Sequence, residues 1–321
     1  MASHSNLLGG AIAFGVAVVS NYGVNLQKQL HRTLAQDGDW DISYTHHCVW
    51  WWGMLLVTLG SVGDLVAFSF ARAAVVAAVG GVTTIIANVV FAQCVNHEPL
   101  HKTDLLGIAS LIGAVILLAV ASRDEASYDV TALSGLFESR VYLTYVGLQA
   151  LLLVTLSARL YHTKRESVKS LCFAAISGTI GAMSVLLGKC TVEMLSQTVQ
   201  GRYFALSHGL FYGVAVSLIV CVASQTHSLN RAFSNGDIMA ALPIFQMFWI
   251  GLAVVGDIVF YHSYTSFTTN DWLLYLVILG LMVVGCTCVA SSRLLRANDD
   301  GYVAVSDADV EKTMQHDDVY A

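Results

Sequence analysis

Two acidic residues, Asp64 and Asp257, stand inside long apolar stretches of a 321-residue chain in which only 12% of residues are charged. A carboxylate inside a bilayer costs at least about 2.5–3.5 kcal/mol, so it persists beside a partner, in a wet cavity or in a functional role. Carboxylate oxygens suit hard divalent cations, which proteins often hold with one or two acids. Both residues are therefore candidate metal ligands on a cation pathway, or members of a proton relay.

Each acid also has a structural interpretation. Asp64 lies one helical turn after Ser61 and shares its face, but it is close to the end of its apolar stretch and could reach interfacial water. Asp257 could pair with Lys189, although Glu193 lies four residues after that lysine and could form the ion pair instead. If both acids line a pathway on one side of the membrane, they would form a negative funnel that concentrates cations.

Other polar residues within or next to the apolar stretches could extend such a pathway. Asn88 and Gln246 are amides within these stretches, where an isolated amide is more often a hydrogen-bond partner between helices. Glu98 could be an exit ligand or a plain interfacial charge. Small residues let helices approach closely in lipid. Four glycines are expected to do so: Gly60, Gly63, Gly178 and Gly181.

The elements that must position these residues are membrane-spanning helices. Hydrophobic residues make up 56% of the chain and the mean hydropathy is +0.65. The apolar runs have the length of roughly 20 residues that a helix needs to cross a bilayer, and they lack the alternation of β-barrel strands. Nine runs qualify: 7–25, 47–68, 73–95, 105–121, 141–161, 171–190, 204–224, 238–260 and 272–291. The predicted fold is an all-α polytopic membrane bundle.

The number of spans and the domain limits follow from the connections. If residues 47–95 held three short helices, the bundle would have ten spans. The connections are short and polar, and the longest, residues 122–140, leaves no room for a soluble catalytic domain. We expect one transporter domain over residues 1–296 and an acidic, disordered tail over residues 297–321, where the net charge of −6 resides. The tail is expected to be plain solvated chain.

Several function classes find no support in the residues. Nothing resembles an ATP-binding loop or a nucleophile triad, so we expect no enzyme activity, no cofactor and no nucleic-acid partner. The expected surroundings are a lipid bilayer. In the tail, Tyr302 begins a Tyr-x-x-apolar pattern of the kind that endocytic adaptors bind, although four-residue patterns of this kind are common by chance.

Orientation follows from the Lys and Arg residues of alternate loops, because cytosolic loops carry the excess. One side carries Lys28, Arg32, Lys102, Arg159, Lys164, Arg165, Lys169, Arg231, Arg293 and Arg296, and the other carries Arg72, Arg123, Arg140 and Arg202. This distribution predicts an external amino terminus, a cytosolic carboxyl terminus and an odd number of spans. Both acids then lie near the outer face. The expected location is the plasma membrane or an endosomal membrane.

A weak internal repeat relates residues 60–98 to residues 228–263. Each segment has a polar turn, an Ala-Phe pair and a long apolar run that closes on a histidine, His97 or His262. On the predicted orientation the two copies cross the membrane in opposite directions. Inverted repeats with a binding site at their interface are a common plan of secondary transporters.

Short motifs in a fixed order add a family resemblance. They are WWWGM (50–54), Gly60, AFSFA (67–71), Glu98, SGTIGAMSV (177–185), Lys189, LNRA (229–232) and LPI (242–244). This series is similar to the NIPA-type magnesium transporters, which belong to the drug/metabolite transporter superfamily. The resemblance runs from about residue 9 to residue 291 and implies an inverted-repeat transporter fold with Mg²⁺ as the substrate.

The chain also departs from that family at informative positions. Where the family usually has a Gly-Glu pair, this chain has Gly60 and Ser61, and Asp64 stands where the family has an asparagine. The resemblance thus implies a divergent member in which the acid has moved by one helical turn.

Three functions follow as hypotheses. The first is transport of divalent cations, Mg²⁺ before others, along an acid-lined pathway. The second is a carrier of a small organic solute coupled to protons or ions, which a broad cavity lined by aromatic residues would favour. The third is a membrane receptor or scaffold, in which Asp64 and Asp257 would both be paired and sealed from water.

Overall fold

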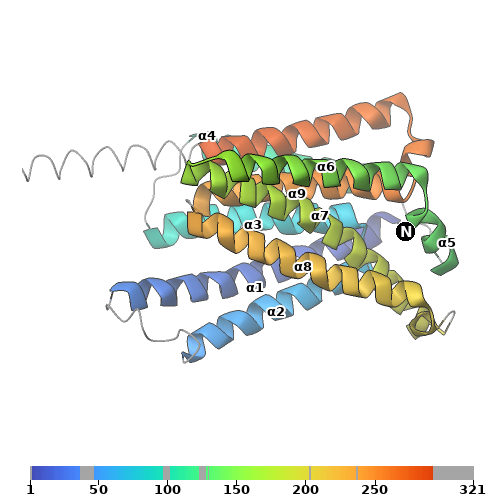
Figure 1. Cartoon of the computed structure of the whole chain (residues 1–321), viewed down its shortest axis with the longest axis horizontal. Helices are drawn as coiled ribbons and strands as arrows, with labels where there is room; N and C mark the ends of the chain where they lie inside the picture. Colours follow the sequence, from blue (N-terminus) through green and yellow to red (C-terminus); the bar gives the residue numbers. More distant parts are fainter. Residues whose placement is uncertain are drawn as a thin grey trace, which may run out of the picture.

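The computed structural model describes the chain except for residues 1, 37–46, 97–101, 123–127, 129, 202–203, 236–237 and 292–321. The described part is helical, and its long helices lie side by side along one direction (Figure 1). The helices are α1 (Ala2–Gln36), α2 (Cys48–Phe68), α3 (Ala73–Asn96), α4 (Lys102–Ala121), α5 (Val130–Phe137), α6 (Arg140–His162), α7 (Glu166–Val199), α8 (Gly209–Asn235), α9 (Ile238–Phe260) and a last helix, Thr269–Ser291. Short 3₁₀ turns occupy Ala205–Ser207 and Ser263–Ser266.

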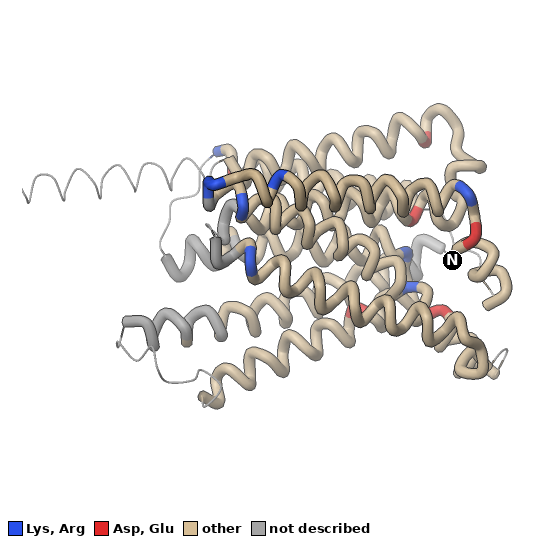
Figure 2. The backbone as a smooth tube through the Cα atoms, in the orientation of Figure 1, with Lys and Arg blue, Asp and Glu red and all other residues tan. Residues whose placement is uncertain are grey.

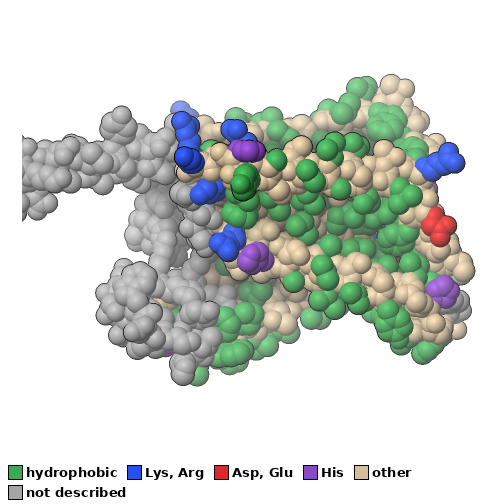
Figure 3. All heavy atoms as spheres, viewed as in Figure 1, with side chains coloured by type: hydrophobic (Ala, Val, Ile, Leu, Met, Phe, Trp, Pro, Cys, Tyr) green, Lys and Arg blue, Asp and Glu red, His purple; other side chains and the backbone are tan. Residues whose placement is uncertain are grey.

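This architecture confirms the predicted polytopic membrane bundle. In the described chain, 8 helices are long and apolar enough to cross a membrane, and α3 adds a shorter apolar segment, Ala73–Ala87. The region from residue 47 to residue 95 holds two helices, α2 and α3, and not three. The flanks of the bundle carry exposed apolar side chains, as a lipid-facing surface must (Figure 3).

Some boundaries differ from the sequence prediction. Helix α7 spans 34 residues, from Glu166 to Val199, whereas its apolar run suggested residues 171–190. Within this extension, Glu193 accepts a hydrogen bond from the Tyr128 amide at 2.7 Å, which satisfies the acid inside the fold. The connection after α4 also contains the short helix α5, whose Val130 and Leu133 are fully buried.

The helix contacts repeat between the two halves. Helix α1 packs mainly against α2 and α3, and α7 packs mainly against α8 and α9. Helices α3 and α9 meet between the halves, and α3 begins at the end of the bundle where α9 finishes (Figure 1). Corresponding helices therefore run in opposite directions, as the inverted repeat of residues 60–98 and 228–263 requires.

The four predicted packing glycines lie at close helix crossings. A Cβ atom built on Gly60 would lie 2.6 Å from the Ser20 Cβ of α1, and one built on Gly63 would collide with Val16. On α7, a Cβ atom on Gly178 would lie 2.5 Å from the Phe245 carbonyl oxygen of α9. Gly181, also on α7, faces the candidate site described below.

Charge is distributed unevenly between the two ends of the bundle. Lys and Arg gather where α6 and α8 end and α7 begins, and acids lie toward the opposite end (Figure 2). Arg72 was counted among the loop charges of the outer side, but its side chain is buried, with 5% exposed. Removing it from the loop count makes the predicted asymmetry larger.

Candidate cation site

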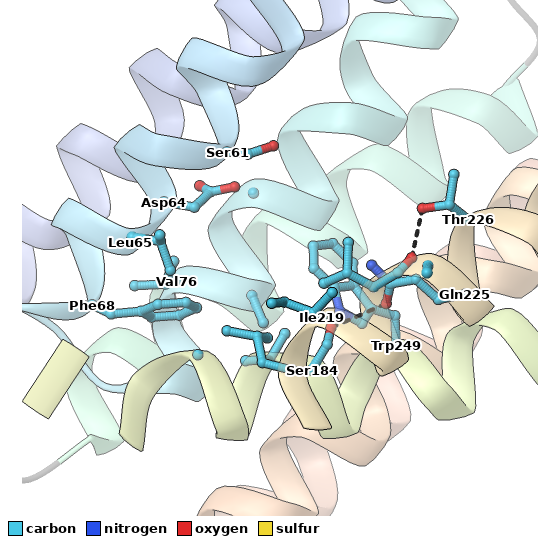
Figure 4. Close-up of a pocket in the computed structure, with 17 residues that line it drawn as sticks. Ser61, Asp64, Leu65, Phe68, Val76, Ser184, Ile219, Gln225, Thr226 and Trp249 are labelled. Carbon is cyan, nitrogen blue, oxygen red and sulfur yellow. Dashed lines mark hydrogen bonds between the residues drawn. The ribbon is translucent and has the colours of Figure 1, made fainter. Parts of the chain in front are cut away.

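A cavity of about 660 Å³ lies among five helices: α2, α3, α7, α8 and α9. Both halves of the repeat therefore contribute to its walls. From α2 come Ser61, Asp64 and Phe68, which Figure 4 shows on one side. Of the described residues that line the cavity, Asp64 alone carries a charge.

Asp64 is half-buried and lies one turn before the end of α2. Among the residues that the structure describes, no hydrogen bond or ion pair reaches its carboxylate. Ser61 projects from the same face of α2 (Figure 4), and its hydroxyl donates to the Val57 carbonyl at 3.1 Å. The predicted shared face of Ser61 and Asp64 thus borders the cavity, and the carboxylate oxygens remain available to a ligand.

The facing wall carries neutral polar groups from the other half of the chain. Gln225 and Thr226 project from α8, Ser184 from α7 and Trp249 from α9 (Figure 4). The Ser184 hydroxyl lies 3.0 Å from the Gln225 Oε1 atom. The Thr226 hydroxyl donates to the Val222 carbonyl of its own helix at 2.8 Å. Most other lining residues are apolar, so polar contacts concentrate on these two opposing walls.

Asp257 has a different environment. The Arg72 guanidinium donates two hydrogen bonds to the Asp257 Oδ2 atom, at 2.6 Å from Nη2 and 2.9 Å from Nε. Arg72 Nη2 also donates to the Ser263 hydroxyl at 2.9 Å. Only 2% of Asp257 is exposed, and it does not line the cavity. The ion pair ties the corner between α2 and α3 to the end of α9.

Lys189, the predicted alternative partner of Asp257 or Glu193, interacts electrostatically with Glu193, and it also contacts the end of α2. Its ammonium donates to the carbonyl oxygens of Phe68, at 2.8 Å, and Ala71, at 3.1 Å. Both carbonyls lie at or just past the end of α2, where backbone acceptors lack partners within the helix. Lys189 therefore anchors the end of the helix that carries Asp64.

The remaining predicted pathway residues divide into described and undescribed groups. Gln246 is buried, with 2% exposed, and its Oε1 atom has no hydrogen-bond partner in the described structure. It lies between α9 and α3, because a Cβ atom on Gly81 would be 2.6 Å from that oxygen. The Asn88 side chain and the whole of Glu98 fall outside the described residues.

Sequence reasoning missed the facing wall and the partner of Asp257. Gln225, Ser184 and Trp249 carry no charge, so nothing in the apolar runs distinguishes them from packing residues. Arg72 did carry a signal, because it is an isolated base between two apolar stretches, on the same predicted side as Asp257. A base on the same predicted side as an intramembrane acid is a candidate partner for that acid.

A bundle of membrane-spanning helices in inverted halves, with a cavity between the halves, defines a polytopic membrane transporter. The sequence model of the family described as "Magnesium transporter NIPA" matches residues 4–294. The chain belongs to this family. Membership supports the expectation that the protein is not an enzyme, and it confirms the resemblance drawn from the motifs.

Individual relatives are distant. NIPA-like protein 2 of Mus musculus is 24% identical over 304 residues, which cover 94% of this chain and 78% of the relative. "Probable magnesium transporter NIPA8" of Arabidopsis thaliana is 24% identical over 316 residues, covering 92% and 69%. "Magnesium transporter NIPA3" of Homo sapiens is 22% identical over 305 residues, covering 86% and 72%. No solved structure matches the chain.

Proposed function

We propose that the protein carries Mg²⁺ across a membrane through the cavity, with Asp64 as the acid that attracts the ion. The observation that carries the proposal is the Asp64 carboxylate, which borders the cavity and has no protein partner among the described residues. Several relatives are named as magnesium transporters, which makes Mg²⁺ the first substrate to test.

The size of the cavity suits a hydrated ion. Mg²⁺ gives up its waters reluctantly and is commonly held by one or two carboxylates with several waters retained. Six waters at about 30 Å³ each occupy roughly 180 Å³. The cavity of about 660 Å³ therefore admits the ion with its water shell. Asp64 neutralises part of the charge, and Ser61 can hydrogen-bond a water of the shell.

Asp257 enters this proposal as a structural residue. Its Oδ2 atom accepts both hydrogen bonds from Arg72, and the pair holds the wall that carries Asp64 against α9. We keep Gln246, Asn88 and Glu98 as proposed members of the pathway beyond the cavity. The cytosolic carboxyl terminus remains a proposal that the distribution of Lys and Arg supports. A location in the plasma or endosomal membrane also remains a proposal.

A second candidate function is transport of a small organic solute. The walls of the cavity are mainly apolar and include the rings of Phe68 and Trp249, and Asp64 is the one acid among the described residues that line it. This composition fits an organic cation, since a carboxylate would bind its charge and the aromatic faces would contact its apolar part. Coupling to protons or ions would use the same carboxylate.

The test is flux through the purified full-length chain in liposomes, read by a Mg²⁺-sensitive dye. We expect uptake by the wild type and a loss of about tenfold or more for Asp64→Asn, as removal of one charged contact worth about 1.4 kcal/mol predicts. Asp271→Asn is the matched control, because Asp271 is half-buried at the start of the last helix and does not line the cavity.

Equal uptake by Asp64→Asn and the wild type would refute the acid-lined pathway. If the wild type moves tetramethylammonium but not Mg²⁺, the organic-solute function replaces the first proposal. Absence of flux for both probes would favour a receptor or scaffold.

A further inference from the structure

Gln225 faces Asp64 across the cavity, from the opposite half of the chain (Figure 4). It is half-buried on α8, and its amide is the only Gln or Asn side chain among the described residues that line the cavity. An amide oxygen is a neutral hard ligand of the kind that Mg²⁺ and its bound waters accept. Gln225 thus has the chemistry to complete a site that Asp64 alone leaves one-sided.

Ser184 and Gly181 position this amide. The Ser184 hydroxyl lies 2.8 Å from the Gly181 carbonyl oxygen and 3.0 Å from Gln225 Oε1. A hydroxyl has one hydrogen, so it can satisfy only one of these acceptors at a time. The shorter contact is to the Gly181 backbone. Gln225 Oε1 therefore retains lone pairs for a ligand in the cavity, while Ser184 still restricts its position.

Gly181 provides the space for this arrangement. A Cβ atom on Gly181 would lie 2.7 Å from Gln225 Oε1 and 2.9 Å from the Trp249 Cδ1 atom. These separations are too short for a real Cβ atom, so any side chain at this position would displace the amide or the indole. Gln225 can therefore take its observed position because residue 181 is a glycine.

Trp249 gives an independent sign that an oxygen belongs here. Its Nε1 atom is buried and has no hydrogen-bond partner in the described structure, and the residue lines the cavity. An unmet buried N–H group is costly, and an indole N–H can only donate. A water or another oxygen within the cavity would satisfy it. The same wall therefore holds an acceptor with a lone pair left for a ligand, Gln225 Oε1, and a donor without a described partner, Trp249 Nε1.

We propose that Gln225 contacts the transported cation or its water shell opposite Asp64, and that Ser184 and Gly181 are its positioning residues. The proposal rests on the proposed transport of Mg²⁺. The ion is then gripped between an acid from the first half and an amide from the second half of the repeat. The carboxylate supplies the charge, and the neutral amide supplies geometry without a second charge that would hold the ion too tightly to release.

The test measures Mg²⁺ uptake by the full-length chain in liposomes for Gln225→Leu, Gln225→Glu and the control Gln200→Leu. Gln200 is an exposed amide just past the end of α7, and it does not line the cavity. We expect Gln225→Leu to raise KM about tenfold, as loss of about 1.4 kcal/mol of contact energy predicts. Gln225→Glu should lower KM and slow turnover. Gln200→Leu should match the wild type.

Gly181→Ala provides a second route to the same answer. It should raise KM in the wild-type background and have little added effect in Gln225→Leu, because the amide that it displaces is already absent. Thermal unfolding of each variant, measured with and without about 10 mM MgCl₂, shows whether the variant folds and whether it binds Mg²⁺. A smaller Mg²⁺-induced rise in Tm should accompany each higher KM.

The outcomes separate the two proposals. If the wild type moves Mg²⁺ and Asp64→Asn does not, but Gln225→Leu retains the wild-type KM, the role of Gln225 is refuted while the transport function survives. Equal losses in Gln200→Leu and Gln225→Leu would also refute it, because the effect would then not depend on the position of the amide in the cavity. If the wild type moves no Mg²⁺, the proposed function itself fails.

Discussion

Asp64 and Asp257 are the same chemical group in similar sequence surroundings, yet the fold treats them in opposite ways. Asp64 is half-buried beside a cavity of about 660 Å³ and has no partner among the described residues. Asp257 is 2% exposed and accepts two hydrogen bonds from Arg72. Asp64 is available to a substrate, whereas Asp257 forms a structural ion pair.

The difference lies in where the balancing charge comes from. Arg72 supplies it for Asp257, whereas the Asp64 carboxylate borders the cavity and has no partner among the described residues. A buried ion pair adds little net stability, but loss of one partner leaves a charge uncompensated in a low-dielectric interior. The two acids should therefore respond to the same substitution in different measurements, Asp257 in stability and Asp64 in transport.

The largest effect is expected at the Arg72–Asp257 pair. Asp257→Asn leaves the buried Arg72 without its counter-charge, and breaking such a pair typically costs about 3–5 kcal/mol. We expect a correspondingly lower free energy of unfolding, measured by denaturant titration in detergent, and low yield in the membrane. The double variant Arg72→Met/Asp257→Leu should recover most of the loss, because it removes both charges and keeps the volume.

This prediction would fail if Asp257→Asn were as stable as the wild type but lost Mg²⁺ uptake. That result would return Asp257 to the cation pathway and erase the contrast with Asp64. A double variant no more stable than Asp257→Asn would show that packing, and not charge, dominates the site.

The positions of the helices were predictable from the sequence, because each apolar run is long enough to cross a bilayer and hydropathy alone reveals that length. Sequence reasoning placed Asp64 on a pathway for the same reason, since an acid in an apolar run is conspicuous. The partner of Asp257 was not predictable in this way. Arg72 lies 185 residues away in the chain, and the packing of α3 against α9 brings the two residues together.

The facing wall was beyond prediction for a second reason. Gln225 differs from other amides of the spans only in its neighbours, Gly181 and Ser184, which come from another helix. Likewise, α5 has eight residues, too few for its apolar period to stand out within a polar connection. Properties carried by single residues were predictable, and properties that depend on contacts between helices were not.

A smaller effect is expected at Lys189, which contacts the end of α2, the helix that carries Asp64. Lys189→Met keeps the length of the side chain but removes the donors to the Phe68 and Ala71 carbonyls. Hydrogen bonds that involve a charged group contribute about 1.5–3 kcal/mol. We expect a loss of stability in that range and a partial loss of Mg²⁺ uptake, because the end of α2 positions Asp64.

Lys189→Arg is the matched control, because it retains the charge and the donors. If Lys189→Met left both stability and uptake unchanged, the carbonyl contacts would be incidental, and Asp64 would be held by the packing of α2 alone.

A still smaller effect is expected at the crossing of α1 and α2. Gly60→Ala places a Cβ atom 2.6 Å from the Ser20 Cβ, so the helices must separate slightly. Overpacking of this kind costs about 1–3 kcal/mol, and a single methyl group belongs at the lower limit. Gly147→Ala is the control, because nothing lies within 4 Å of the added atom. If both variants unfold at the same temperature, the close approach at Gly60 does not constrain the helix that carries Asp64.

The smallest effect is the one that defines the contrast most sharply. Asp64→Asn removes a charge that has no described protein partner, so it breaks no ion pair and should change the free energy of unfolding by less than about 0.5 kcal/mol. A slight gain in stability would also agree with the proposed role of Asp64. An unpaired acid beside an apolar wall destabilises the fold, and such a residue is retained when function requires it. Denaturant titration without Mg²⁺ gives the measurement, with Asp257→Asn in parallel. A loss of about 3 kcal/mol or more would mean that Asp64 is held by a partner as Asp257 is, and the two acids would then be structural equivalents.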